Sequence, residues 1–88
     1  MNAIEHRIVL THAAANVFYF TGTPQCMLGS NGFVGAGFVQ AADGSFSATN
    51  HYRPGRSATR TWRDRAALLA WMRRVARSHC FTCPWSVS

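Results

Sequence analysis

The chain has 88 residues, of which 48% are hydrophobic and 12% aromatic. A chain of this length forms a single domain with a small core, and this composition argues against intrinsic disorder. We therefore expect one small domain over residues 1–88. No apolar run reaches the roughly 18 residues of a membrane-spanning helix, and no secretory signal is visible. An odd number of cysteines, 3, does not suit a secreted disulfide framework, so we expect a cytoplasmic protein without membrane contact.

The charge is strongly basic and concentrated in one part of the chain. Nine basic residues, all arginine, accompany three acidic residues, and the formal net charge is +6. Apart from Arg7, the arginines all lie between Arg53 and Arg77. Such a local charge indicates a polyanionic partner. A GC-rich genome, which encodes arginine in place of lysine, is an alternative explanation without any binding role.

The first half of the chain has the patterns of β-strands. His6–Thr11 (HRIVLT) alternates, and Asn16–Thr21 (NVFYFT) is rich in β-branched and aromatic residues. Cys26–Leu28 is a candidate for a short third strand.

The strongest hairpin signal joins Phe33–Gln40 to Phe46–Tyr52 through a two-residue Asp-Gly turn at 43–44. This turn sets Val39 opposite Ala48 and predicts that both lie on the core side of the sheet. Phe38 and His51 then lie on the opposite side, together with one of two apolar pairs, Val17 and Tyr19 or Phe18 and Phe20. Because monomers seldom expose large apolar patches, this side is predicted to be a protein interface, such as that of a homodimer.

The segment Arg53–Arg60 (RPGRSATR) is predicted to be a polar loop, and Thr61–Ser78 (TWRDRAALLAWMRRVARS) an amphipathic helix. The first residue of this helix forms a capping box with Asp64, and Thr59 is an alternative cap. Residues 79–88 are expected to form a tail. The apolar helix face comprises Trp62, Ala66, Leu68, Leu69, Met72, Val75 and Ala76.

The predicted fold is therefore α+β. An antiparallel β-meander of four to five strands, within residues 1–53, precedes one C-terminal amphipathic helix packed on one face.

The arginines are the leading candidates for a binding site. They are predicted to form one surface over the loop and the helix, with an aromatic ring, Trp71, able to stack on an unpaired base. The residues of this surface are Arg53, Arg56, Arg60, Arg63, Arg73, Arg74 and Arg77. The alternative is that the helical arginines only complement the helix dipole and keep the protein soluble.

The second candidate is the Cys80-x-x-Cys83 motif, which offers half of a tetrahedral zinc site. Cys26 with a histidine could complete it, but no second pair has the spacing of zinc ligands. We therefore expect no metal or cofactor, and a zinc-stabilised domain is a third alternative.

Catalysis has little support, because three acidic residues leave few partners for the four histidines. A small nuclease using His51 is the enzymatic alternative. The sequence favours a non-enzymatic module that binds nucleic acid or a nucleoprotein through its arginines. The alternative is a protein interaction module, such as an accessory or inhibitor protein of a mobile element, that uses the apolar sheet face.

Overall fold

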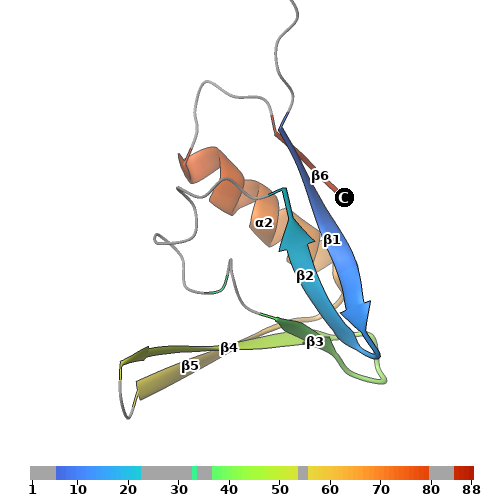
Figure 1. Ribbon diagram of the computed structural model, residues 1–88, viewed down its shortest axis with the longest axis vertical. Helices are drawn as coiled ribbons and strands as arrows, with labels where there is room; N and C mark the ends of the chain where they lie inside the picture. The colour runs from blue at the N-terminus through green and yellow to red at the C-terminus, as the bar shows by residue number, and fades with distance from the viewer. Residues whose placement is uncertain (1–5, 23–32, 34–36, 54–55, 80–84) are drawn as a thin grey trace, which may run out of the picture.

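The computed structural model of the protein describes residues 6–22, 33, 37–53, 56–79 and 85–88. Within these ranges, six strands form one sheet in the order β5-β4-β3-β2-β1-β6, and one helix lies on one face of it (Figure 1). The elements are β1 (His6–Ala14), β2 (Val17–Thr21), β3 (Phe38–Gln40), β4 (Phe46–Arg53), β5 (Arg56–Trp62), α2 (Arg65–His79) and β6 (Trp85–Val87). Neighbouring strands are antiparallel except β1 and β6, which are parallel. The predicted α+β class is confirmed, with more strands than expected.

Strands β1 and β2, which lie in the two segments with predicted strand patterns, pair as an antiparallel hairpin. Leu10 pairs with Phe20, and these two side chains are buried together with Ile8. Of the two faces of β2 that the sequence left open, the one with Phe20 faces the core, and Tyr19 is 44% exposed on the other side. The pairing with β2 extends β1 beyond the predicted end, to Ala14.

The hairpin between β3 and β4 differs from the prediction by one residue. Gln40 pairs with Phe46, and the Ala41 N–H donates to the Ser45 carbonyl at 2.8 Å. The loop therefore contains three residues, in which Gly44 adopts a φ of 90° that a side chain would disfavour. The Gly44 N–H donates to the Ala41 carbonyl at 3.0 Å, so a four-residue turn ends at this left-handed glycine, whereas the prediction assumed a two-residue turn.

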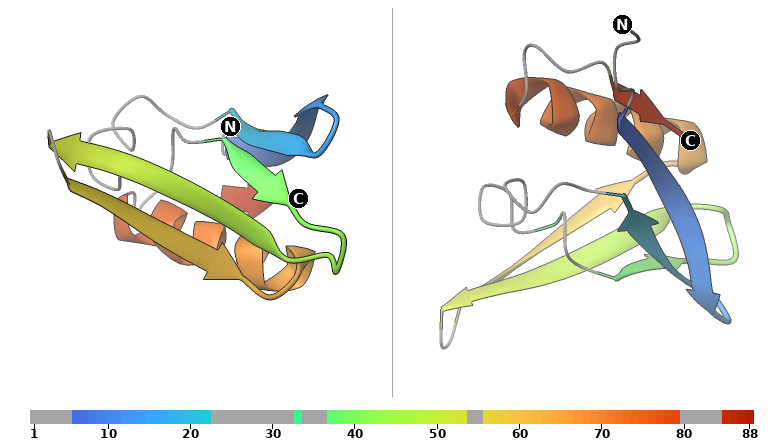
Figure 2. Two further views of the ribbon diagram at one scale, coloured as in Figure 1. Left: turned by 90° about the horizontal axis from the view of Figure 1, so that it is seen from below. Right: turned by 45° about the horizontal axis from the view of Figure 1, so that its top comes forward.

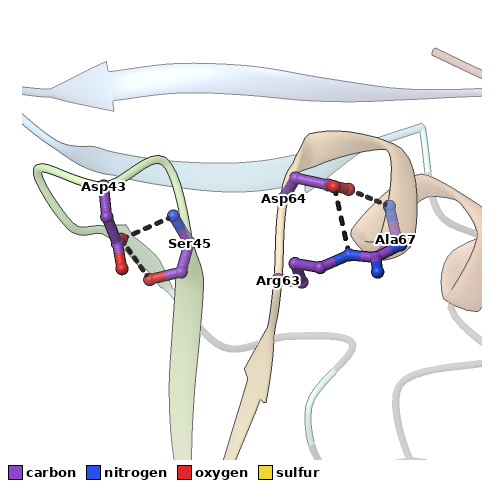
Figure 3. Close-up of polar contacts among 5 residues, drawn as sticks. All are labelled: Asp43, Ser45, Arg63, Asp64 and Ala67. Atoms are coloured by element: carbon purple, nitrogen blue, oxygen red, sulfur yellow. Dashed lines mark hydrogen bonds and ion pairs between the residues drawn. The ribbon is translucent and has the colours of Figure 1, made fainter.

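Asp43 closes this loop through its carboxylate (Figure 3). The Oδ1 atom of Asp43 accepts hydrogen bonds from the Ser45 hydroxyl at 2.6 Å and from the Ser45 backbone N–H at 3.0 Å. These two bonds, the hydroxyl first, hold the pKa of Asp43 below its usual value. Because the pKa is lowered in the folded state, this stabilisation is present above the usual pKa and is lost as the pH falls through the folded value.

The change of register exchanges the two faces of β3. Phe38 has no exposed surface and lies in the core, whereas Val39 is 42% exposed. The prediction that Phe38 belongs to an exposed sheet-face interface is therefore wrong, because a shift of one residue turns every side chain of a strand to the other side. On β4 the predicted core face is correct, since Phe46 and Ala48 are both buried.

Strand β5 occupies most of the segment that was predicted to be a loop. Its residues pair with β4 along Phe46↔Trp62 to Arg53↔Arg56, and the hydroxyls of Thr49 and Thr59 lie 2.9 Å apart. The prediction failed because the serine, threonine and arginine residues of β5 resemble a polar loop. They instead suit an edge strand that is half exposed.

Helix α2 begins at Arg65, four residues after the predicted start. Asp64, rather than Thr61 or Thr59, is its N-cap: Asp64 Oδ1 accepts a hydrogen bond from the Ala67 backbone N–H at 2.8 Å (Figure 3). Trp62, which the prediction placed on the helix, is the last residue of β5.

The helix connects the two edges of the sheet. It follows β5 at one edge and precedes β6 at the other, and so covers one face (Figure 2). Within the predicted tail, β6 pairs with β1, and Val87 is buried beside the helix. The core formed between sheet and helix comprises Ile8, Leu10, Phe20, Phe33, Phe38, Phe46, Ala48, Trp62, Leu68, Trp71, Met72, Val75, Ala76 and Val87.

The observed register predicts that substitutions at two neighbouring positions change the stability by very different amounts. We expect Phe38→Ala to lower the free energy of unfolding by about 3–5 kcal/mol, because it leaves a cavity in the core. Val39→Ala, on the outer side, should change it by about 0.5 kcal/mol or less. Urea denaturation of both variants measures this difference, and a larger loss for Val39→Ala would support the register predicted from the sequence instead.

The N-cap of α2 gives a second prediction. Asp64→Ala removes the acceptor of the Ala67 N–H and should cost about 1 kcal/mol of stability. Asp64→Asn keeps an acceptor oxygen at the same position, so it serves as the control and should retain most of the stability in the same denaturation measurement. Equal stability of the alanine variant and the wild type would show that another residue caps the helix.

Candidate nucleic-acid interface

The buried side of α2 determines where its arginines lie. Five side chains, recurring at intervals of three and four residues, pack against the sheet: Leu68, Trp71, Met72, Val75 and Ala76. The polar residues are therefore left on the opposite side. Arg73, Arg74 and Arg77, which we call the helical arginine cluster, are all exposed there.

The helical arginine cluster is not neutralised within the described part of the chain. Helix α2 contains no acidic residue, and the structure gives no ion pair to any of the three arginines there. Arg73 and Arg77 are four residues apart, and like charges at this spacing destabilise a helix by about 0.2–0.5 kcal/mol. Their position in the second half of the helix, near the negative end of its dipole, offsets part of this cost.

Arg60 occupies a different kind of position. Its guanidinium carbon lies 5.4 Å from the ring centroid of Trp62 and 5.5 Å from that of Trp71, although the Arg60 side chain is exposed. The two tryptophan rings are buried and 4.9 Å apart. Arg60 thus covers an aromatic surface where β5 meets α2.

The predicted role of Trp71 as a base-stacking ring is wrong. Trp71 is only 3% exposed and packs against Phe38, Trp62 and the Arg60 guanidinium. The prediction treated residues 53–60 as a loop, so it contained no strand that could cover this flank of the helix.

The start of α2 carries two further arginines. Arg63 is 88% exposed, and its Nε lies 3.4 Å from Asp64 Oδ2, a surface ion pair of little energetic value (Figure 3). Arg65, which the sequence analysis did not include in the site, is exposed at the first helical position. The signal for it was its place inside the same run of arginines.

Arg53 and Arg56 lie elsewhere. They pair with each other across β4 and β5, at the end of this hairpin that lies far from the start of α2 (Figure 1). The structure describes the backbone of these two residues but not their side chains. The arginines that were predicted to form one surface are therefore distributed over the helix, its start and the far end of this hairpin.

The side of the sheet that α2 leaves uncovered, which we call the outer sheet face, is different in character. Among the described residues, Tyr19 and Val39 are its most exposed large apolar side chains, and the ring of Tyr19 lies against Gly37. Hydroxyl side chains surround them: Thr11, Thr21, Thr49, Ser57, Thr59 and Thr61. His51 is part of β4, but its side chain is outside the described residues.

The metal and enzyme alternatives gain no support from the described residues. Cys26, Cys80 and Cys83 lie outside them, and within them no group of three or more metal-binding side chains occurs. His12 donates a hydrogen bond from Nε2 to the Ala15 carbonyl and packs against Phe18. The described acidic residues, at positions 43 and 64, are engaged in the turn and the helix cap.

Over the same ranges, the structure contains no helix with the length and apolarity needed to cross a membrane. Comparison of the chain with protein-family models, with curated proteins and with solved structures finds no match.

Proposed function

We propose that the protein binds nucleic acid through the helical arginine cluster. The observation that carries this proposal is a helix whose exposed side bears Arg73, Arg74 and Arg77 without an acidic residue anywhere along it. Surfaces that only confer solubility usually mix both signs of charge, and an unmixed one favours a polyanion.

The spacing of the cluster suits a chain of phosphates better than a single small anion. Arg73 and Arg77 are separated by about 6 Å along the helix axis, and their long side chains can contact neighbouring phosphates of one strand. Arg74 extends the cluster toward β5, where Arg60 lies. Phosphate contacts of this kind supply affinity and orientation but little sequence preference.

Salt dependence tests this proposal. We expect the purified protein to bind labelled DNA or RNA with an affinity that falls steeply as salt increases. The triple variant Arg73→Gln/Arg74→Gln/Arg77→Gln should reduce the slope of log K against log salt by about 2–3 units on duplex DNA, since each lost phosphate contact removes about 0.9. Glutamine preserves helix propensity, so the variant should remain folded.

Arg7→Gln provides the control. Arg7 is exposed on β1, next to the buried Ile8 and thus on the other side of the sheet from α2. Its removal should leave the slope unchanged. Loss of binding in both variants would indicate nonspecific attraction to the net charge, and no binding by the wild type at low salt would contradict the proposal and favour an acidic protein as the partner.

Self-association through the outer sheet face is the second candidate function. Val39 and Tyr19 expose 42% and 44% of their surface there. The described residues of this face carry no charge apart from Arg7 at its margin. Two copies could therefore approach through this face with their helical arginines on opposite outer sides, which favours a second copy over a charged partner.

Sedimentation over a range of protein concentrations tests this candidate. Dimers of the wild type that dissociate on Val39→Glu are the expected result, because the substitution buries a charge in the contact. Wild-type protein that stays monomeric at the highest concentration would exclude self-association. Val39 is exposed, so the variant should still fold, and circular dichroism checks this.

A further inference from the structure

Arg60 differs from the helical arginine cluster in being held by other side chains. Its guanidinium lies over both Trp62 and Trp71, at 5.4 Å and 5.5 Å from the ring centroids. Within the described residues it has no ion pair or hydrogen bond that would occupy its N–H groups. A guanidinium in cation–π contact with aromatic rings has further N–H groups that can donate hydrogen bonds to a ligand.

The surface beneath Arg60 consists of two buried tryptophan rings. Trp62 is 5% exposed and Trp71 is 3% exposed, and both rings contact the fully buried Phe38. The indole N–H of Trp62 is buried and has no hydrogen-bond partner among the described residues. Contact with both rings restricts the rotation of the Arg60 side chain in the folded protein, so Arg60 loses less conformational entropy when it binds a ligand.

Arg60 also lies beside the flank of α2 that carries Arg74, a member of the helical arginine cluster. Trp71, which it contacts, precedes Arg74 by three residues, so these two positions are neighbours on the helix surface. Arg60 thus extends the cluster from the helix to β5. This geometry distinguishes it from Arg63, whose side chain is 88% exposed and pairs with Asp64.

We propose that Arg60, oriented by Trp62 and Trp71, binds one phosphate group of the nucleic acid through a two-point contact. The inference rests on the proposed function and specifies it further. Two parallel N–H···O bonds from one guanidinium match the spacing of two phosphate oxygens, and a lysine ammonium cannot reproduce them. The guanidinium held over the two rings supplies the direction of this contact, while the helical arginine cluster supplies most of the general attraction.

Conservative substitution tests the inference, with Arg63 as the matched control. Arg60→Lys keeps the charge but removes the planar fork, so affinity should fall about tenfold, the loss of one charge-assisted hydrogen bond, while the salt slope stays the same. Arg63→Lys should stay within about twofold of the wild type. Arg60→Gln should lower both the affinity and the salt slope, the slope by about 0.9 on duplex DNA.

Tryptophan emission provides a second readout, because Arg60 contacts two of the three tryptophans. Addition of an oligonucleotide should change the emission of the wild type and of Arg63→Lys but much less that of Arg60→Lys. Thermal melting confirms that each variant is folded, with a loss of at most a few degrees from the missing stacking contact.

The two proposals fail in different ways. Wild-type binding that Arg60→Lys retains in full would overturn the role of Arg60 and leave the helical arginine cluster as the site. A tenfold loss in both Arg60→Lys and Arg63→Lys would also overturn it, because the effect would then follow from any arginine-to-lysine change. No binding by the wild type would overturn the proposed function and this inference together.

Discussion

The buried ring of Phe38 joins the parts of the structure. Phe38 belongs to β3, a strand of 3 residues that connects the β1–β2 hairpin to the β4–β5 hairpin. Its ring centroid lies 5.2 Å from that of Phe20, 5.4 Å from that of Trp62 and 6.2 Å from that of Trp71, in edge-to-face arrangements. One side chain thus contacts both hairpins and the helix, and the packing around it fixes the face on which the helix lies.

The position of the candidate site follows from this packing. Because Trp71 points toward Phe38, the arginines that follow it on the helix are directed to solvent. Because Trp62 approaches the same ring from β5, Arg60 comes to lie over both tryptophans. The aromatic residues contribute to the site by orienting a cation from within the core, whereas the sequence suggested that one of them would meet the ligand directly.

The parts of the fold that local patterns determine could be predicted, and those that depend on distant partners could not. Alternation identified β1, and β-branched and aromatic residues identified β2. Helical periodicity with the nearby arginines identified α2 and the cluster on it. The register of β3 depended on Gly44 and a loop of three residues, a difference too small for the pattern to reveal. Strand β5 could not be predicted, because its polar segment becomes a strand only where β4 pairs with it. The burial of Trp71 could not be predicted either, because it depends on Trp62 at the end of that strand.

The pairing of β6 with β1 has a consequence for synthesis of the chain. Ser88 exchanges hydrogen bonds with β1, accepting one from the Leu10 N–H at 2.7 Å and donating one to the Ile8 carbonyl at 2.9 Å. On the ribosome β1 emerges early, but the strand that satisfies these groups is made some eighty residues later. Until then β1 is an open edge to which other nascent chains can add. Strand β6, one of the two strands of only 3 residues and the last of the sheet to be made, therefore limits how long the newborn protein is vulnerable to aggregation.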